Sequence, residues 1–147
     1  MKVLFLCRAN IGRSQMANVL YNKIIKEGSI GAGAKVKSER EGMVVGDVVG
    51  AVNMMPCMQE VGIDISGSKI KQVTPEMVSW ADKIIVMTSK ENLPEFVLDS
   101  GKVEFWKVED PKGMDIEGHC KIRDQIKGLI EKMFVVIDGR VVCISGG

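Results

Sequence analysis

The sequence lacks the features typical of membrane proteins, secreted proteins and nucleic-acid-binding proteins. No apolar run approaches the roughly 18 residues that a membrane-spanning helix needs. The apolar start, residues 1–7, is too short for the apolar region of a signal peptide. Lys and Arg number 20 against 19 Asp and Glu, so the basic excess of a nucleic-acid binder is missing. These absences predict a cytoplasmic protein that binds neither nucleic acid nor membrane.

Metal-binding patterns are also missing. The only histidine, His119, stands at the start of a predicted helix, where we expect a structural or solvated side chain. The four cysteines, Cys7, Cys57, Cys120 and Cys143, include no pair at the short spacing of a metal site. We therefore expect a reduced protein without metal or cofactor, in which Cys57, Cys120 and Cys143 are buried or semi-buried and inert.

The chain does have the composition and size of one globular domain over residues 1–147. Short apolar runs alternate with helical patterns, which predicts an α/β fold with a four-stranded parallel sheet and helices on both faces. Apolar runs around Asp138-Gly139 add a predicted C-terminal β-hairpin with a type I′ turn. The predicted strands are 3–6, 34–38, 83–87 and 103–107, and the predicted helices are 14–28, 48–61, 74–80, 90–96 and 119–134.

The stretch with the clearest chemistry lies between the first predicted strand and the first predicted helix. Helix N-termini carry unpaired N–H groups and the positive end of the helix dipole, so a loop there can surround an oxyanion. Cys7 would lie at the base of this loop, where the same field favours the nucleophilic thiolate. Arg13 could bind two oxygens of a tetrahedral oxyanion. The predicted binding residues are Arg8, Ala9, Asn10, Ile11, Gly12, Arg13 and Ser14.

A carboxyl group can reach this loop from another part of the predicted sheet. Asp110-Pro111 follows the fourth predicted strand, and loops at the carboxyl ends of parallel strands share one edge. Asp110 there could protonate a leaving group and then activate water. Alone, Asp-Pro is only a turn signal, and Cys-x5-Arg also fits a buried cysteine beside surface arginines.

Together these motifs resemble the superfamily of low-molecular-weight protein tyrosine phosphatases and thioredoxin-coupled arsenate reductases, over nearly all of residues 1–134. The resemblance implies that Cys7 is the nucleophile, that Arg13 binds phosphate and that Asp110 is the general acid. It also implies that Asn10 and Ser14 hold the loop. Beyond these residues it rests on Gln15-Met16-Ala17, Glu60-x-Gly62-Ile63-Asp64 and Ala81-Asp82.

The sequence departs from both branches of this superfamily. Gly12 stands where many of the phosphatases have a second cysteine, and Lys112 stands where phosphotyrosine-specific members have a tyrosine. The reductases carry two redox cysteines in the segment that is 86–94 here, which contains none. Residues 15–17 and 121–126 nevertheless resemble the reductase branch.

These observations predict a cysteine-dependent phosphate-monoester hydrolase that acts through a cysteinyl-phosphate intermediate. Its expected substrate is a phosphorylated protein or a small phosphate ester. One alternative is an arsenate reductase that uses an external thiol, with arsenate as substrate. The others are a non-catalytic oxyanion-binding module, with Asp110 out of reach, and a pure interaction protein. Neither the substrate nor the oligomeric state follows from the sequence.

Overall fold

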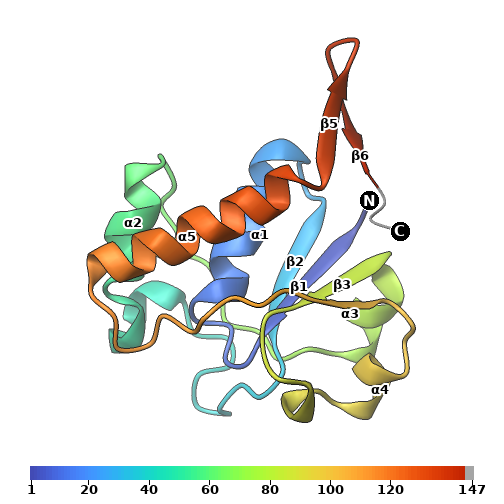
Figure 1. Cartoon of the computed structure of the whole chain (residues 1–147). Coiled ribbons are helices and arrows are strands. Elements are labelled where there is room, and N and C mark those ends of the chain that lie inside the picture. The colour runs from blue at the N-terminus through green and yellow to red at the C-terminus, as the bar shows by residue number, and fades with distance from the viewer. Residues whose placement is uncertain (145–147) are drawn as a thin grey trace.

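A four-stranded parallel sheet forms the centre of the computed structural model, which describes residues 1–144 (Figure 1). The strand order is β2-β1-β3-β4, and all pairings are parallel, with Val3 opposite both Ser29 and Lys83. The predicted architecture is therefore confirmed. The strands are β1 (Val3–Cys7), β2 (Ser29–Gly33), β3 (Lys83–Val86) and β4 (Val103–Phe105).

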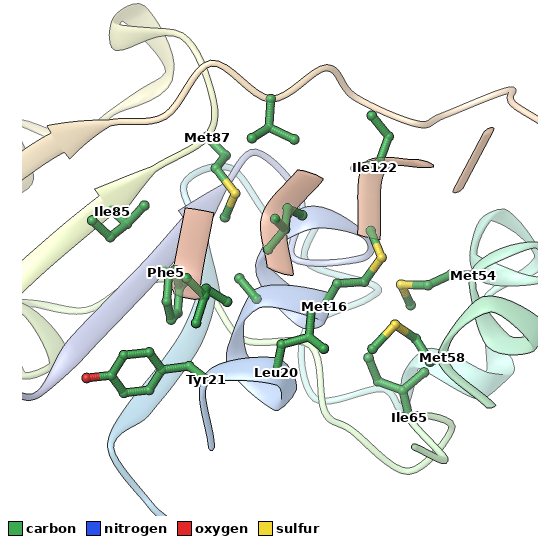
Figure 2. Close-up of a cluster of buried hydrophobic side chains, with 14 of the residues drawn as sticks. Phe5, Met16, Leu20, Tyr21, Met54, Met58, Ile65, Ile85, Met87 and Ile122 are labelled. Carbon is green, nitrogen blue, oxygen red and sulfur yellow. The ribbon is translucent and has the colours of Figure 1, made fainter. Parts of the chain in front are cut away.

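Alternating side chains of β1 explain why helices cover both faces of the sheet. Val3 and Phe5 belong to one buried cluster and Leu4 and Leu6 to another, because successive side chains of a strand point to opposite faces. Figure 2 shows the first cluster, in which Phe5 and Ile85 of the sheet lie at one side and Met54 and Met58 of α2 lie at the other, beside Met16 of α1. The helices on this face are α1 (Arg13–Ile24), α2 (Met54–Glu60) and α5 (Ile116–Glu131), and those on the other are α3 (Pro75–Trp80) and α4 (Glu95–Leu98).

The second strand lies earlier than predicted. The prediction was 34–38, whereas β2 spans Ser29–Gly33, a run rich in small residues. The small residues are needed because a Cβ at Gly33 would lie 2.9 Å from the carbonyl carbon of Ala9 and 3.0 Å from the carbonyl oxygen of Arg8. Close backbone approach, rather than apolar pattern, therefore determines this strand.

Prolines divide two of the predicted helices. The predicted helix 48–61 becomes a 3₁₀ turn, Val49–Ala51, followed by α2, with Pro56 at the third helical position where its missing N–H has no intrahelical acceptor. The predicted helix 90–96 likewise becomes a 3₁₀ turn, Lys90–Asn92, followed by α4 directly after Pro94. A further 3₁₀ turn spans Val45–Asp47.

Helix caps decide two other boundaries. Thr74 accepts a hydrogen bond from the backbone N–H of Met77, which confirms the predicted start of α3. The last helix begins at Ile116 rather than at His119, because the Asp115 side chain accepts from the backbone N–H of Gly118. The first helix, predicted from residue 14, begins at Arg13.

The predicted hairpin is confirmed as β5 (Phe134–Ile137) and β6 (Arg140–Cys143), paired antiparallel. Asp138 and Gly139 have φ of 51° and 75°, as a type I′ turn requires. The hairpin follows α5 and extends away from the sheet and its helices (Figure 1). Among residues 1–144, no helix has the length and apolar character that crossing a membrane would demand.

Candidate active site

The predicted oxyanion loop, residues 8–12, links the carboxyl end of β1 to the N-terminus of α1. The carbonyl oxygen of Cys7 accepts a hydrogen bond from the backbone N–H of Ala34, and that of Arg8 accepts one from Lys35. In the part of the chain that the structure describes, no backbone N–H of residues 8–12 donates to a protein acceptor. The loop thus engages its carbonyl groups with protein and keeps its N–H groups available to an anion.

Asn10 fixes the shape of this loop. It is fully buried and has a φ of 56°, a left-handed conformation that asparagine tolerates better than most residues. Its Oδ1 accepts hydrogen bonds of 3.0 Å from Gln15 Nε2 and from the backbone N–H of Lys71. The Gln15 amide also donates to the carbonyl oxygens of Asn10 and Lys69. Contacts from a distant segment therefore hold the turn.

A short chain of hydrogen bonds leads from Asn10 to the predicted nucleophile. Asn10 Nδ2 donates to Ser14 Oγ at 2.7 Å, and Ser14 Oγ lies 2.9 Å from Cys7 Sγ. Because the Ser14 oxygen already accepts from Asn10, its hydroxyl hydrogen is free to donate to sulfur. All three side chains are buried. Ser14 is thus placed to stabilise a thiolate on Cys7.

The Arg13 guanidinium joins the ends of two other strands. Its NH1 group donates to the carbonyl oxygens of Met87, after β3, and of Val108, after β4. Its NH2 nitrogen lies 3.7 Å from Asp110 Oδ2, so the two oppositely charged side chains form an ion pair. The sheet edge therefore brings Arg13 and Asp110 together, although 97 positions separate them in the sequence.

The Asp110-Pro111 turn lies beside the oxyanion loop. A Cβ added at Gly12 would lie 3.6 Å from Pro111 Cγ, so the two segments are only about one methyl group apart. Asp110 Oδ1 accepts a hydrogen bond from the backbone N–H of Lys112, so the turn also holds the carboxylate in place. The half-exposed carboxylate faces both Arg13 and solvent.

The remaining predicted site residues differ in exposure. Arg8 is exposed, whereas Ala9, Ile11 and Gly12 are partly buried in the loop. His119 is 4% exposed and its Nδ1 lies 2.9 Å from the carbonyl oxygen of Asp115. The structural role predicted for this histidine matches its position.

The prediction that Cys57 and Cys120 are separate, inert thiols is wrong. They form a disulfide between α2 and α5, with their Cα atoms 5.2 Å apart. Because 63 positions separate them, only the packing of the two helices reveals the pair. Cys7 and Cys143 carry free thiols.

An open hollow of about 800 Å³ lies beside Arg13. Phe105 and Trp106 contribute aromatic surface to it, and Thr88, Ser89 and Gln125 contribute polar groups. Cys7 and Asp110 do not line this hollow. These two aromatic side chains come from the end of β4 and from the position directly after it.

These features define a class of α/β proteins with a cysteine at the end of the first strand, a following loop whose N–H groups are free of protein acceptors, and an arginine and an aspartate at the same sheet edge. Comparison with known proteins identifies the family. Residues 2–141 match the family described as low molecular weight phosphotyrosine protein phosphatase. The chain therefore belongs to the low-molecular-weight phosphotyrosine protein phosphatase family.

Proteins similar to this chain include an arsenate reductase and phosphatases. The glutaredoxin arsenate reductase of Synechocystis sp. is 31% identical over 137 residues, which cover 92% of this chain and 98% of that protein. The low-molecular-weight protein tyrosine phosphatase of T. tengcongensis has a TM-score of 0.70 and 28% identity, over 90% of this chain and 96% of that one. The YwlE arginine phosphatase of Geobacillus stearothermophilus has a TM-score of 0.70 and 27% identity, over 89% and 88%.

Proposed function

We propose that the protein hydrolyses phosphate monoesters, on a phosphorylated protein or a small molecule, through a cysteinyl-phosphate intermediate on Cys7. The observation that carries this proposal is the position of Asp110. Its carboxylate lies 3.7 Å from the Arg13 guanidinium and its turn lies beside the oxyanion loop. Hydrolysis of an ester needs a proton donor at the leaving oxygen, and Asp110 is the carboxyl group that pairs with Arg13 at this edge of the sheet.

The first half of the reaction transfers the phosphoryl group to sulfur. The Cys7 thiolate attacks phosphorus, the S–P bond forms, and the ester P–O bond breaks. Asp110 gives its proton to the leaving oxygen, which departs as an alcohol or a phenol. The loop N–H groups and the Arg13 NH2 group stabilise the charge on the three equatorial oxygens.

The second half returns the enzyme to its starting state. The Asp110 carboxylate takes a proton from a water molecule, whose oxygen attacks phosphorus as the S–P bond breaks. Inorganic phosphate leaves, and the sulfur is again a thiolate that accepts a hydrogen bond from Ser14. Asp110 is protonated again and ready for the next ester.

The test is hydrolysis of p-nitrophenyl phosphate by the wild-type chain and by Cys7→Ser. We expect turnover by the wild type and none by the variant, because a serine hydroxyl is far less nucleophilic than a thiolate. Cys143→Ser is the matched control and should behave as the wild type, since Cys143 lies in the hairpin. Wild-type activity in Cys7→Ser would overturn the mechanism. Phosphate binding without turnover by the wild type would support the binding-module alternative.

Arsenate reduction with an external thiol is a second candidate, favoured by the relatives named as arsenate reductases. The Cys7 thiolate would attack arsenate, so that an S–As bond forms while an As–O bond breaks and its oxygen leaves as water. An external thiolate would then attack the Cys7 sulfur, arsenite would leave with two electrons, and a second external thiol would release Cys7 and a disulfide. The segment 86–94 contains no cysteine that could replace the first external thiol.

Arsenate reduction should therefore depend on glutathione and not pass through an intramolecular Cys7 disulfide. The measurement is arsenite release with glutathione or thioredoxin, beside mass spectrometry of arsenate-treated protein without small thiols. A thioredoxin-reducible disulfide between Cys7 and another cysteine of the chain would contradict this expectation and favour the reductase over the phosphatase.

A further inference from the structure

Only one cysteine of the Cys57–Cys120 pair is accessible to solvent. Cys57 lies on α2 and is fully buried, whereas Cys120 lies in the second turn of α5 and is partly exposed. A thiol from solvent can therefore attack the sulfur of Cys120 and not that of Cys57. Their Cα separation of 5.2 Å lies within the range that disulfides require.

The surroundings also suit the reduced form of this pair. Cys57 Sγ lies 3.0 Å from the carbonyl oxygen of Ile116, which can accept the hydrogen of a Cys57 thiol. Cys120 Sγ lies 3.9 Å from Glu60 Oε2, which can accept the hydrogen of a Cys120 thiol. Each thiol of the open pair therefore has an acceptor, and opening the disulfide leaves no buried polar hydrogen unpaired.

Arg123 keeps the two helices together whether or not the disulfide is closed. Its buried guanidinium donates from NH1 to the carbonyl oxygen of Cys57 at 2.7 Å and lies 3.4 Å from Glu60 Oε1. Because α5 supplies Arg123 while α2 supplies both of its partners, the two sulfurs remain near each other after reduction. The disulfide can then form again without refolding.

We propose that Cys57 and Cys120 form a second thiol–disulfide centre, separate from Cys7, that exchanges reversibly with low-molecular-weight thiols. A small thiolate attacks Cys120 Sγ, the S–S bond breaks, and Cys57 leaves as a thiolate that takes a proton from water. A second small thiolate attacks the outer sulfur of the mixed disulfide, which releases Cys120 and a small-molecule disulfide. The protein gains two electrons and the two small thiols lose them.

The disulfide is linked to Asp110, the proposed acid, through the segment that leads from Asp110 into the start of α5. Asn53 Nδ2, just before α2, donates to the carbonyl oxygen of Met114 at 3.0 Å. Met114 lies only four positions after Asp110, so the disulfide and the Asn53 hydrogen bond hold both ends of the segment that follows the acid. The inferred effect of reduction is looser placement of Asp110, and this part of the inference rests on the proposed function.

The exchange itself is tested on Cys7→Ser/Cys143→Ser, which retains only Cys57 and Cys120. The variant is equilibrated in buffers with different ratios of reduced and oxidised glutathione, alkylated under denaturing conditions, and weighed by mass spectrometry. We expect a single two-electron transition from two labelled thiols to none. Two labelled thiols at every ratio, or only glutathione adducts on separate cysteines, would overturn the proposal.

The stabilising effect of the disulfide has its own readout in thermal unfolding. Closing a loop of this length should raise the melting temperature by about 10 °C, and reduction should remove this increment. Cys143→Ser should show the same shift on reduction as the wild type. Cys120→Ser should show none, and a full shift in Cys120→Ser would contradict the assignment of the pair.

Coupling to the acid is tested by the leaving group, with no reductant present. Relative to p-nitrophenyl phosphate, phenyl phosphate should be hydrolysed several-fold more slowly by Cys57→Ser than by the wild type, while Cys143→Ser keeps the wild-type ratio. An unchanged ratio in Cys57→Ser would overturn the coupling. If no form hydrolyses either ester, the proposed phosphatase function fails, whereas thiol counting still decides the redox centre.

Discussion

At the scale of single residues, Ser14 links Asn10 of the loop to Cys7, the proposed nucleophile. Its hydroxyl accepts from Asn10 and lies 2.9 Å from Cys7 Sγ, in a buried environment where an unpaired polar group is costly. Motif reasoning could place Cys7, Arg13 and Asp110 at the site, because their spacing and their positions after strands are visible in the sequence. It could not identify Gln15 or Lys71 as partners of Asn10, because only the folded chain brings them to it.

Removing the Ser14 hydroxyl should slow the reaction of Cys7. We expect Ser14→Ala to lower the rate of iodoacetamide alkylation at neutral pH by about 10- to 100-fold, the equivalent of one hydrogen bond to a charged group. Ser14→Thr retains a hydroxyl and serves as the control. An unchanged alkylation rate in Ser14→Ala would show that Ser14 does not stabilise the thiolate.

Neutralising Asp110 should affect poor leaving groups most. General acid catalysis typically raises the reaction rate by about 10²–10⁴-fold, and it matters only where the departing oxygen needs a proton. Asp110→Asn should therefore lose far more activity on phenyl phosphate than on p-nitrophenyl phosphate, as measured by kcat. Equal losses on both esters would remove Asp110 from the role of acid. Glu109→Gln, which neutralises the neighbouring carboxylate, is the control.

At the scale of elements, the predictions succeeded where one local signal dominates. The apolar runs of β1 and β3, the Thr74-Pro75 helix start and the Asp138-Gly139 turn all act within a few residues, so the sequence shows them. The prediction of β2 failed because its residues are selected for a close approach between backbones. The Cys57–Cys120 pair was missed because helix packing creates it.

A methyl group at Gly33 should disturb the oxyanion loop. Its Cβ would lie 2.9 to 3.0 Å from backbone atoms of Ala9 and Arg8, so the strand or the loop must shift. We expect Gly33→Ala to lower the free energy of unfolding by about 1–3 kcal/mol in urea and to weaken phosphate binding. Gly67→Ala, where a Cβ meets nothing within 4 Å, is the matched control and should change neither. Equal stability of the two variants would contradict this account.

At the scale of the whole molecule, the larger core connects the sheet, three helices and the hairpin. Tyr21 of α1 packs against Phe5 of β1 and Phe134 of β5, with ring centroids 5.7 and 5.4 Å apart. Its hydroxyl donates to the carbonyl oxygen of Met1 at 2.6 Å. Tyr21 is the only tyrosine in the chain, so a titration of tyrosine absorbance reports on this one side chain.

Alkaline titration should reveal this burial. Burial, together with the charges of Cys143 and Asp82, raises the pKa of Tyr21 to about 12 from an ordinary value of 10.0. The folded state therefore holds the Tyr21 proton more tightly than the unfolded state, so the contribution of Tyr21 to stability is constant below about pH 10 and falls as the pH rises towards 12. Absorbance at 295 nm should show a midpoint near pH 12 in the native protein and near 10 in denaturant.

Tyr21→Phe should lose this absorbance change entirely and should lose less stability between pH 10 and pH 12 than the wild type. A native midpoint near pH 10 would show that the hydroxyl is open to solvent.

The way Arg13 reaches across the sheet has a consequence for protein synthesis. The segment with Cys7 leaves the ribosome well before Met87 and Val108, whose carbonyl groups hold Arg13. During translation the nascent chain therefore carries an unprotected thiol until the β4 segment has emerged. Oxidants should damage this cysteine more readily in the growing chain than in the finished protein, in which Cys7 is only 3% exposed.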